Sequence, residues 1–139
     1  MSRIVLDAVG GDHAPKEAIA GVAMALQNGF LQADEVVLTG PEQQVREAVK
    51  AAGLPSEIEI FDAPDLLSPS DSPTDAMRKK PRNSIAVGMQ LVKEGKAGAF
   101  VSAGSTGTVV AAATLGLRYL EGIRRAAIGV IIEGEKHPF

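Results

Sequence analysis

Two short segments rich in glycine, hydroxyl and ionisable residues could do chemistry. The first is Ser102-Ala103-Gly104-Ser105-Thr106-Gly107, between a short apolar run and a mostly apolar helical pattern. Backbone N–H groups at a helix start lack partners and favour an anion, glycines let the backbone approach it, and hydroxyls add donors. A phosphate could therefore bind at Ser102, Gly104, Ser105, Thr106 and Gly107. An interpretation in which Ser105 or Thr106 only caps the helix is equally open.

The second segment is Asp7-Ala8-Val9-Gly10-Gly11-Asp12-His13-Ala14-Pro15. His13 could donate a hydrogen bond to an anion or move a proton near neutral pH. Asp7 and Asp12 would repel a second negative charge unless they are paired or hold a cation, so a metal site formed with His13 is conceivable. Capping of the next helix by Asp12 is the favoured interpretation. The chain has only two histidines, which excludes chemistry that needs several imidazoles.

A third feature is a basic run, with four cations in the positions from Arg78 to Arg82. Such a run is usually a solvated face or loop. It could also bind an anionic substrate, an acidic protein or an anionic lipid surface, and Arg suits bidentate phosphate contact better than Lys. The run lies in a proline-rich stretch at 63–83, and a loop this long in a compact domain is usually functional or disordered. We therefore expect Arg78, Lys79 and Lys80 to contribute to a substrate site.

The composition excludes several other kinds of site. The 139 residues include no cysteine, which rules out a disulfide, a thiolate metal site, an iron–sulfur cluster and a cysteine nucleophile. The net charge of −3 gives no global basic field for nucleic acid. The P-loop, the dinucleotide fingerprint, the Gly-x-Ser-x-Gly elbow and the His-Glu-x-x-His motif are missing. With 45% hydrophobic and 22% charged residues, the chain fits one soluble domain at 1–139.

Strand and helix patterns alternate along the chain. Short apolar runs predict strands at 4–6, 35–39, 58–61, 97–101 and 126–132. Helical spacing predicts helices at 15–27, 41–53, 84–93 and 108–120, the last packed on much of its circumference, with one helical turn near 75–80. This alternation implies an α/β fold, a three-layer α/β/α sandwich with a mostly parallel sheet. Ligands sit beyond the carboxyl ends of such strands, which directs attention to the loops at 7–14, 63–83 and 102–107.

The segment from Asp7 to Pro15 resembles the N-terminal signature Asp-Ala-Met-Gly-Gly-Asp-His-Ala-Pro of the PlsX family of phosphate acyltransferases. Further segments agree in order, namely Asp71–Lys80, Ser84–Lys93 and Gly95–Gly107. The departures are Val9 in place of Met, Ser105 in place of Asn, and Arg125-Ala126 in place of a frequent Arg-Pro. The resemblance covers nearly the whole chain. Family members are more than twice as long, so the chain looks like the N-terminal portion of a single α/β acyltransferase domain.

The resemblance implies a fold similar to the phosphate acetyltransferase and isocitrate dehydrogenase group. It implies a reaction in which acyl-(acyl carrier protein) and inorganic phosphate give acyl phosphate and free carrier protein, for bacterial phospholipid synthesis. It also implies a cytoplasmic homodimer, peripheral to the inner face of the membrane, with neither cofactor nor nucleic acid. The alternatives are a short-chain phosphate acyltransferase that uses acyl-coenzyme A, and a non-catalytic fragment that binds phosphate or the carrier. A nucleotide-binding domain is a poorer third.

Phosphate is itself the nucleophile in the implied reaction, so the protein need supply no covalent one. We expect the turn at 102–107 to hold phosphate, or the phosphate of phosphopantetheine, with help from Arg78 or Lys79. We expect His13, or an N–H of the loop with Gly10 and Gly11, to contact the reacting centre. The basic run could instead dock the acidic carrier protein. We predict no resident metal.

Overall fold

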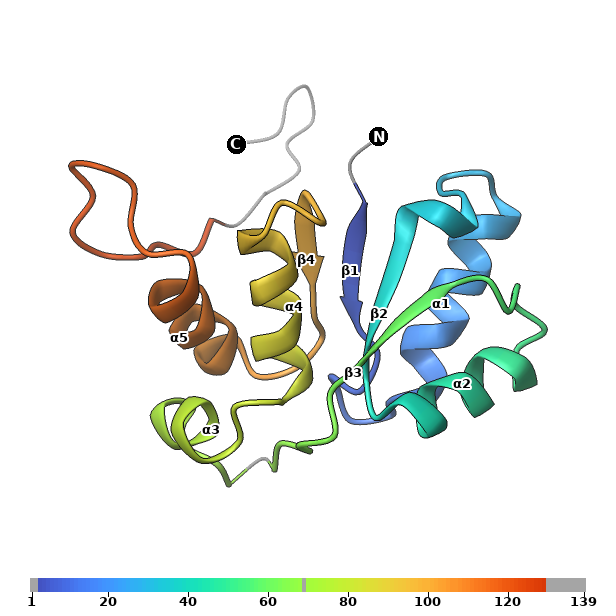
Figure 1. The fold of residues 1–139 in the computed structure, drawn as a ribbon, viewed down its shortest axis with the longest axis horizontal. Coiled ribbons are helices and arrows are strands. Elements are labelled where there is room, and N and C mark those ends of the chain that lie inside the picture. The colour runs from blue at the N-terminus through green and yellow to red at the C-terminus, as the bar shows by residue number, and fades with distance from the viewer. Residues whose placement is uncertain (1–2, 69, 130–139) are drawn as a thin grey trace, which may run out of the picture.

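A computed structural model describes residues 3–68 and 70–129, in which a four-stranded sheet lies between two layers of helices (Figure 1). The sheet has the order β3-β2-β1-β4, and every pairing is parallel. This is the α/β/α sandwich expected from the alternating pattern. The elements in chain order are β1 (Ile4–Asp7), α1 (Lys16–Gln27), the 3₁₀ turn η1 (Ala33–Glu35), β2 (Val36–Gly40), α2 (Glu42–Ala51), β3 (Glu59–Asp62), α3 (Pro73–Lys79), α4 (Ser84–Lys93), β4 (Ala99–Val101) and α5 (Thr106–Gly116).

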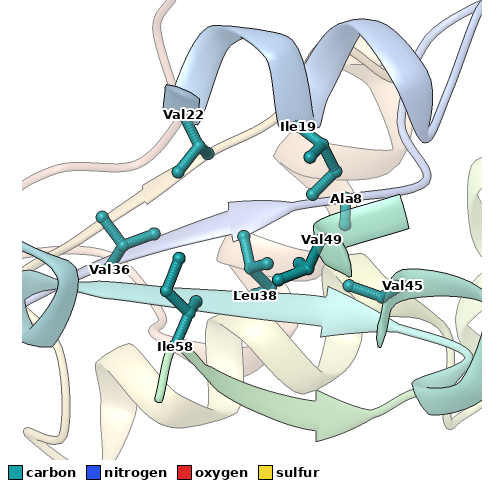
Figure 2. Close-up of a cluster of buried hydrophobic side chains, with 8 residues drawn as sticks. All are labelled: Ala8, Ile19, Val22, Val36, Leu38, Val45, Val49 and Ile58. Atoms are coloured by element: carbon teal, nitrogen blue, oxygen red, sulfur yellow. The ribbon is translucent and has the colours of Figure 1, made fainter. Parts of the chain in front are cut away.

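Strand β2 shows how the sheet separates the two helical layers. Every residue of β2 is buried, and its first three residues, Val36, Val37 and Leu38, are accordingly all apolar instead of alternating with polar ones. Successive side chains point to opposite faces, so Val36 and Leu38 pack with α1 and α2, whereas Val37 packs with Leu91 of α4. Figure 2 shows the first of these clusters, which consists of Ala8, Ile19, Val22, Val36, Leu38, Val45, Val49 and Ile58.

Helices α3 and α5 pack beyond α4, on the side of the sheet away from α1 and α2 (Figure 1). Their shared core contains Ile85 and Met89 of α4, Ala112 of α5 and, at its margin, Met77 of α3. Helix α4 lies very close to the sheet at Gly88, where an added Cβ would stand 2.3 Å from the ring of Phe100. A side chain at this position would therefore push α4 away from β4.

The expected elements are confirmed within a few residues up to the start of α5. The helical turn expected near 75–80 is the longer helix α3, which begins earlier because the Ser72 Oγ accepts a hydrogen bond from the Asp75 N–H at 3.1 Å and Pro73 suits the first helical position. None of the described helices is long and apolar enough to cross a membrane.

The C-terminal part of the described chain differs from the expectation. Helix α5 ends at Gly116 instead of continuing to 120, and only Thr108 and Ala112 are buried in it, so it is not packed on most of its circumference. Leu115 is 66% exposed. Residues 126–129 form no strand, because a strand requires a pairing partner and the described part of the chain provides none for them. The remainder of the strand expected at 126–132 lies outside the described residues.

Candidate functional site

The strand order reverses between β1 and β4. The chain builds β1, β2 and β3 in one direction across the sheet and then returns to the other side of β1 to form β4. The loop after β1 leads to α1 on one face, and the loop after β4 leads to α5 on the other (Figure 1). In open parallel sheets, ligands bind at the carboxyl ends of the strands at such a reversal.

A cleft of about 570 Å³ opens at this reversal. The three loops predicted from the sequence meet there, since the lining comes from the loop after β1, the loop that precedes α3, the turn after β4 and the start of α4. Six of the predicted site residues line it, namely Asp7, Gly10, Gly11, Asp12, Gly104 and Ser105.

Hydrogen bonds join the two loops at the floor of the cleft. The Asp7 carboxylate is 1% exposed, and its Oδ2 accepts a hydrogen bond from the Ser102 hydroxyl at 2.7 Å. The same Ser102 Oγ accepts from the Gly104 N–H at 3.0 Å. We call these three residues the Asp7–Ser102 clasp. It fastens the turn after β4 to the end of β1.

The two loops also touch through their glycines. A Cβ on Gly10 would stand 2.4 Å from the Asp7 Oδ2 and 3.0 Å from the Gly104 nitrogen. Gly11 has φ of +98°, and a Cβ there would stand 3.3 Å from that of Ala103. Glycine is therefore required at both positions, at Gly10 for space and at Gly11 for backbone conformation as well. These contacts bring the backbone of one loop against the other.

Two helices begin at the cleft. The Ser105 Oγ accepts from the Thr108 N–H at 3.4 Å at the start of α5, and the Asn83 Oδ1 accepts from the Ala86 N–H at 2.9 Å at the start of α4. Ser105 therefore caps α5, and its hydroxyl proton remains available to a ligand. Ser84, the first residue of α4, lines the cleft together with Ser105 and Thr108. The positive ends of two helix dipoles and three hydroxyl groups thus lie at one place, a favourable setting for an anion.

Several other predicted residues are not part of the lining, although each is close in the chain to a residue that is. His13 is exposed in the loop after β1 and outside the lining. Thr106 and Gly107 are exposed, and Gly107 lies against α3, where a Cβ would stand 3.2 Å from Pro73 Cγ. Ser102 lies behind the lining and directs its hydroxyl at Asp7.

Asp12 does not have the capping role that we favoured. The N-cap of α1 is Pro15, and no side chain caps that helix. The reason is that the loop places Asp12 at the cleft, several residues before α1 begins. The alternative of a metal site with Asp7 and His13 is not supported either, because no group of three such side chains gathers anywhere in the described ranges.

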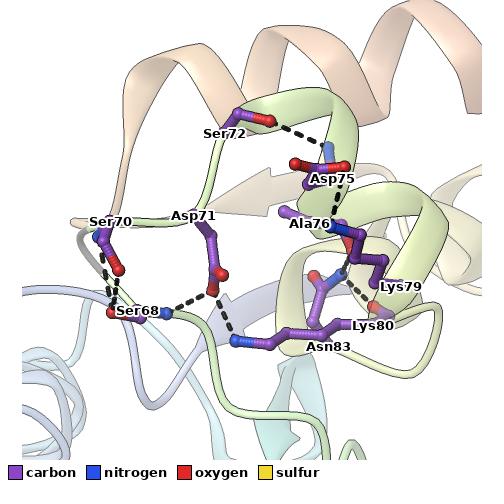
Figure 3. Close-up of polar contacts among 9 residues, drawn as sticks. All are labelled: Ser68, Ser70, Asp71, Ser72, Asp75, Ala76, Lys79, Lys80 and Asn83. Carbon is purple, nitrogen blue, oxygen red and sulfur yellow. Dashed lines mark hydrogen bonds and ion pairs between the residues drawn. The ribbon is translucent and has the colours of Figure 1, made fainter.

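The basic run is paired with aspartates. Figure 3 shows Lys79 with Asp75 and Lys80 with Asp71. Asp75 accepts the Arg78 guanidinium at 2.9 Å and the Lys79 ammonium at 3.4 Å, and Asp71 accepts the Lys80 ammonium at 2.5 Å. The Lys80 ammonium and the Ser68 N–H lower the pKa of Asp71 below its usual value. The Arg78 guanidinium, followed by Lys79, lowers the pKa of Asp75 in the same way.

None of these cations lines the cleft, and the charged residues in the described lining are Asp7, Asp12 and Asp71. Lys80 reaches only its margin, through Asp71. An anion in this cleft would therefore be held by N–H and O–H groups, with Arg78 and Lys79 engaged elsewhere.

Several lining residues were missed by the sequence reasoning, namely Ser68, Asp71, Ser84 and Thr108, with Leu66, Leu67 and Ile85 forming an apolar wall. Asp71 and the pair Ser84-Ile85 belong to the segments that carry the family resemblance, and that signal could have identified them. Nothing in the pattern around Thr108 distinguishes it from an ordinary residue of the first helical turn.

A parallel α/β sandwich with a glycine- and hydroxyl-lined cleft at its strand-order reversal is typical of proteins that bind phosphate-bearing ligands. A family model described as "Fatty acid synthesis protein" matches residues 2–136, and the chain belongs to this family. The resemblance stated above from the sequence motifs is thereby confirmed.

Curated relatives from bacteria carry the name phosphate acyltransferase. Those from Heliobacterium modesticaldum and a Cyanothece species are both 44% identical to this chain, over 132 and 131 residues, and that from Desulfitobacterium hafniense (strain Y51) is 39% identical over 132 residues. These alignments cover 94%, 94% and 95% of this chain but only 38%, 37% and 38% of the relatives. The chain thus spans slightly less than two-fifths of the length of these relatives.

Proposed function

We propose that this chain is the N-terminal part of a phosphate acyltransferase that transfers an acyl group from acyl-(acyl carrier protein) to inorganic phosphate. The products are acyl phosphate and free carrier protein, and the reaction serves bacterial phospholipid synthesis. The observation that carries the proposal is the cleft at the β1–β4 reversal, where glycine loops and two helix starts converge. The name of the relatives supports the reaction class.

The reaction needs no nucleophile from a side chain, because phosphate is the nucleophile. A phosphate oxygen forms a bond to the thioester carbonyl carbon, the C–S bond breaks, and the electron pair leaves with sulfur. Hydrogen phosphate brings a proton that the departing thiolate can take. The protein must therefore hold phosphate beside the thioester carbonyl. It must also stabilise the negative charge that develops on the carbonyl oxygen. The hydroxyl groups of Ser84, Ser105 and Thr108 and the N–H groups at the starts of α4 and α5 supply donors for this task.

The lining also suits the rest of the donor substrate. Leu66, Leu67 and Ile85 form an apolar wall next to these donors, against which an apolar part of the thioester can lie. Two of the aspartates in the lining already have partners, since Asp7 accepts a hydrogen bond from Ser102 and Asp71 forms an ion pair with Lys80. The proposal extends to a cytoplasmic homodimer that associates peripherally with the membrane, and the family resemblance is its support.

The test uses the protein in its full natural length. It is mixed with a long-chain acyl-(acyl carrier protein), with and without inorganic phosphate, and with acetyl- or butyryl-coenzyme A as a second donor. Thiol release is followed colorimetrically, and acyl phosphate is trapped with hydroxylamine. We expect phosphate-dependent release and hydroxamate formation, faster with the carrier donor. Faster turnover of the short coenzyme A thioesters would show the alternative enzyme, and no phosphate-dependent release from either donor would show a binding protein.

A further inference from the structure

We propose that Asp7 is a positioning residue, which acts through Ser102 to hold the turn after β4 in the orientation that phosphate binding needs. The inference deepens the proposed function and rests on it, because it concerns the same cleft. Within the Asp7–Ser102 clasp, Asp7 would hold the site without serving as a ligand of phosphate itself.

The direction of the hydrogen bonds supports this role. A hydroxyl has one proton, and that of Ser102 is donated to the Asp7 Oδ2 at 2.7 Å. The Ser102 oxygen therefore presents a lone pair to the Gly104 N–H, which it accepts at 3.0 Å. This arrangement leaves Ser102 with no proton for a ligand. The carboxylate thus determines how Ser102 is oriented, and Ser102 determines where Gly104 lies.

A carboxylate is the side chain that suits this position. The Asp7 Oδ1 accepts from the Val9 N–H at 3.2 Å, while Oδ2 accepts from Ser102. An amide has a single acceptor oxygen, so an Asn here would turn an NH₂ group toward one of these two donors. Asp7 is 1% exposed, and a buried charge is costly unless it is well hydrogen-bonded, which makes both bonds important.

The clasp connects directly to the lining of the cleft. Gly104 and Ser105 follow Ser102 in the chain, and both line the cleft. Gly10 lies on the other side of Gly104, so close that a Cβ on it would stand 3.0 Å from the Gly104 nitrogen. A turn that lost its bond to Ser102 would shift the donors at the start of α5. Misplacement by about 1 Å can cost on the order of 10²-fold in rate.

The test compares Asp7→Asn, Ser102→Ala, Ser102→Thr and the double variant Asp7→Asn/Ser102→Ala in the protein of full natural length. Asp34→Asn, an exposed carboxylate in η1 far from the cleft, is the matched control. Binding of inorganic phosphate is measured by calorimetry without any acyl donor, and the phosphate KM, kcat and Tm are measured in parallel.

We expect Asp7→Asn and Ser102→Ala each to weaken phosphate binding about tenfold, in line with the loss of a hydrogen bond to a charged group. The double variant should bind phosphate no more weakly than the weaker single variant, because Asp7 acts through Ser102. Ser102→Thr keeps the hydroxyl and should stay within about threefold of wild type, and Asp34→Asn should be unchanged. If Asp7→Asn does not fold, the comparison of Ser102→Ala with Ser102→Thr still tests whether the Ser102 hydroxyl is needed for phosphate binding.

Three results with the variants overturn the inference. One is unchanged phosphate binding and KM in Ser102→Ala, and another is a double variant whose loss is the product of the two single losses. The third is a Ser102→Thr variant as weak as Ser102→Ala. Phosphate binding by a wild type without turnover would refute the proposed reaction but leave the inference intact if the variants lose binding. A wild type that binds no phosphate would overturn both.

Discussion

Gly10 has no room for a side chain, since an added Cβ would stand 2.4 Å from the Asp7 Oδ2 and 3.0 Å from the Gly104 nitrogen. We predict that Gly10→Ala destabilises the protein by about 1–3 kcal/mol, as overpacking of a tight site does. Urea unfolding measures this difference, and the phosphate affinity should fall with it because the loops must separate.

Gly21 offers a matched control for this substitution. It lies in α1, and a Cβ there would have no neighbour within 4 Å. Gly21→Ala should be neutral or stabilise by about 0.5–1 kcal/mol, because Gly is a poor helix former. Equal urea midpoints for the Gly10 and Gly21 variants would show that the loops are free to move apart and that Gly10 is not required.

At the scale of elements, one buried side chain connects α3 to α4. Asn83 is fully buried, its Nδ2 donates to the Lys80 carbonyl at 2.6 Å, and its Oδ1 accepts from the Ala86 N–H at 2.9 Å. We predict that Asn83→Ala lowers the free energy of unfolding by about 2–4 kcal/mol, through the lost cap, the lost hydrogen bond to the Lys80 carbonyl and the cavity left by a buried side chain. Asn28→Ala is the control, because Asn28 is exposed in ordinary helical conformation at the end of α1. Similar losses in the two variants, measured by urea unfolding, would contradict this role for Asn83.

The sequence predicted the elements where local pattern decides the structure. The continuous apolar run Val36-Val37-Leu38 indicated a buried strand, and glycine-rich segments after β1 and β4 identified the two loops that meet at the cleft. The sequence did not predict which residues of distant elements form pairs. The pairing of Arg82 with Asp62 of β3 at 3.0 Å is an example. Asp75 stands only three and four residues before Arg78 and Lys79, so helical spacing could have predicted those two pairs.

Contacts between distant elements also determine the burial of α5 and the lining of the cleft, and local pattern did not predict them. The apolar composition of α5 predicted burial, but only tertiary contacts decide which residues are covered, and Leu115 is 66% exposed. Ser84 and Thr108 reach the cleft because α4 and α5 both begin there, an arrangement that depends on how the helices pack on the sheet. Sequence reasoning could identify the loops that form the site, but not the helix starts that complete it.

At the scale of the whole molecule, the four cations of the basic run are paired with aspartates. Arg78, Lys79, Lys80 and Arg82 each lie within 4 Å of an aspartate, and the aspartates come from three separate stretches of chain. A uniformly positive face for an acidic carrier protein is therefore absent at this run. These pairs instead connect the segment around α3 to β3 and to the loop that lines the cleft.

Acid should loosen this side of the molecule. Asp71 has a pKa below the usual 3.8, chiefly because of the Lys80 ammonium and then the Ser68 N–H. A carboxyl whose pKa is lower in the folded than in the unfolded protein adds stability that is complete above the unfolded value, and this contribution is lost as the pH falls through the folded one. We predict that Asp71→Asn destabilises the protein at about pH 6 and that the difference from wild type shrinks as the pH falls below 3.8. Denaturant unfolding at about pH 6 and at about pH 3 measures it, with Asp34→Asn as control. A difference of the same size at both pH values would mean that Asp71 acts by packing and that its charge contributes nothing to folding.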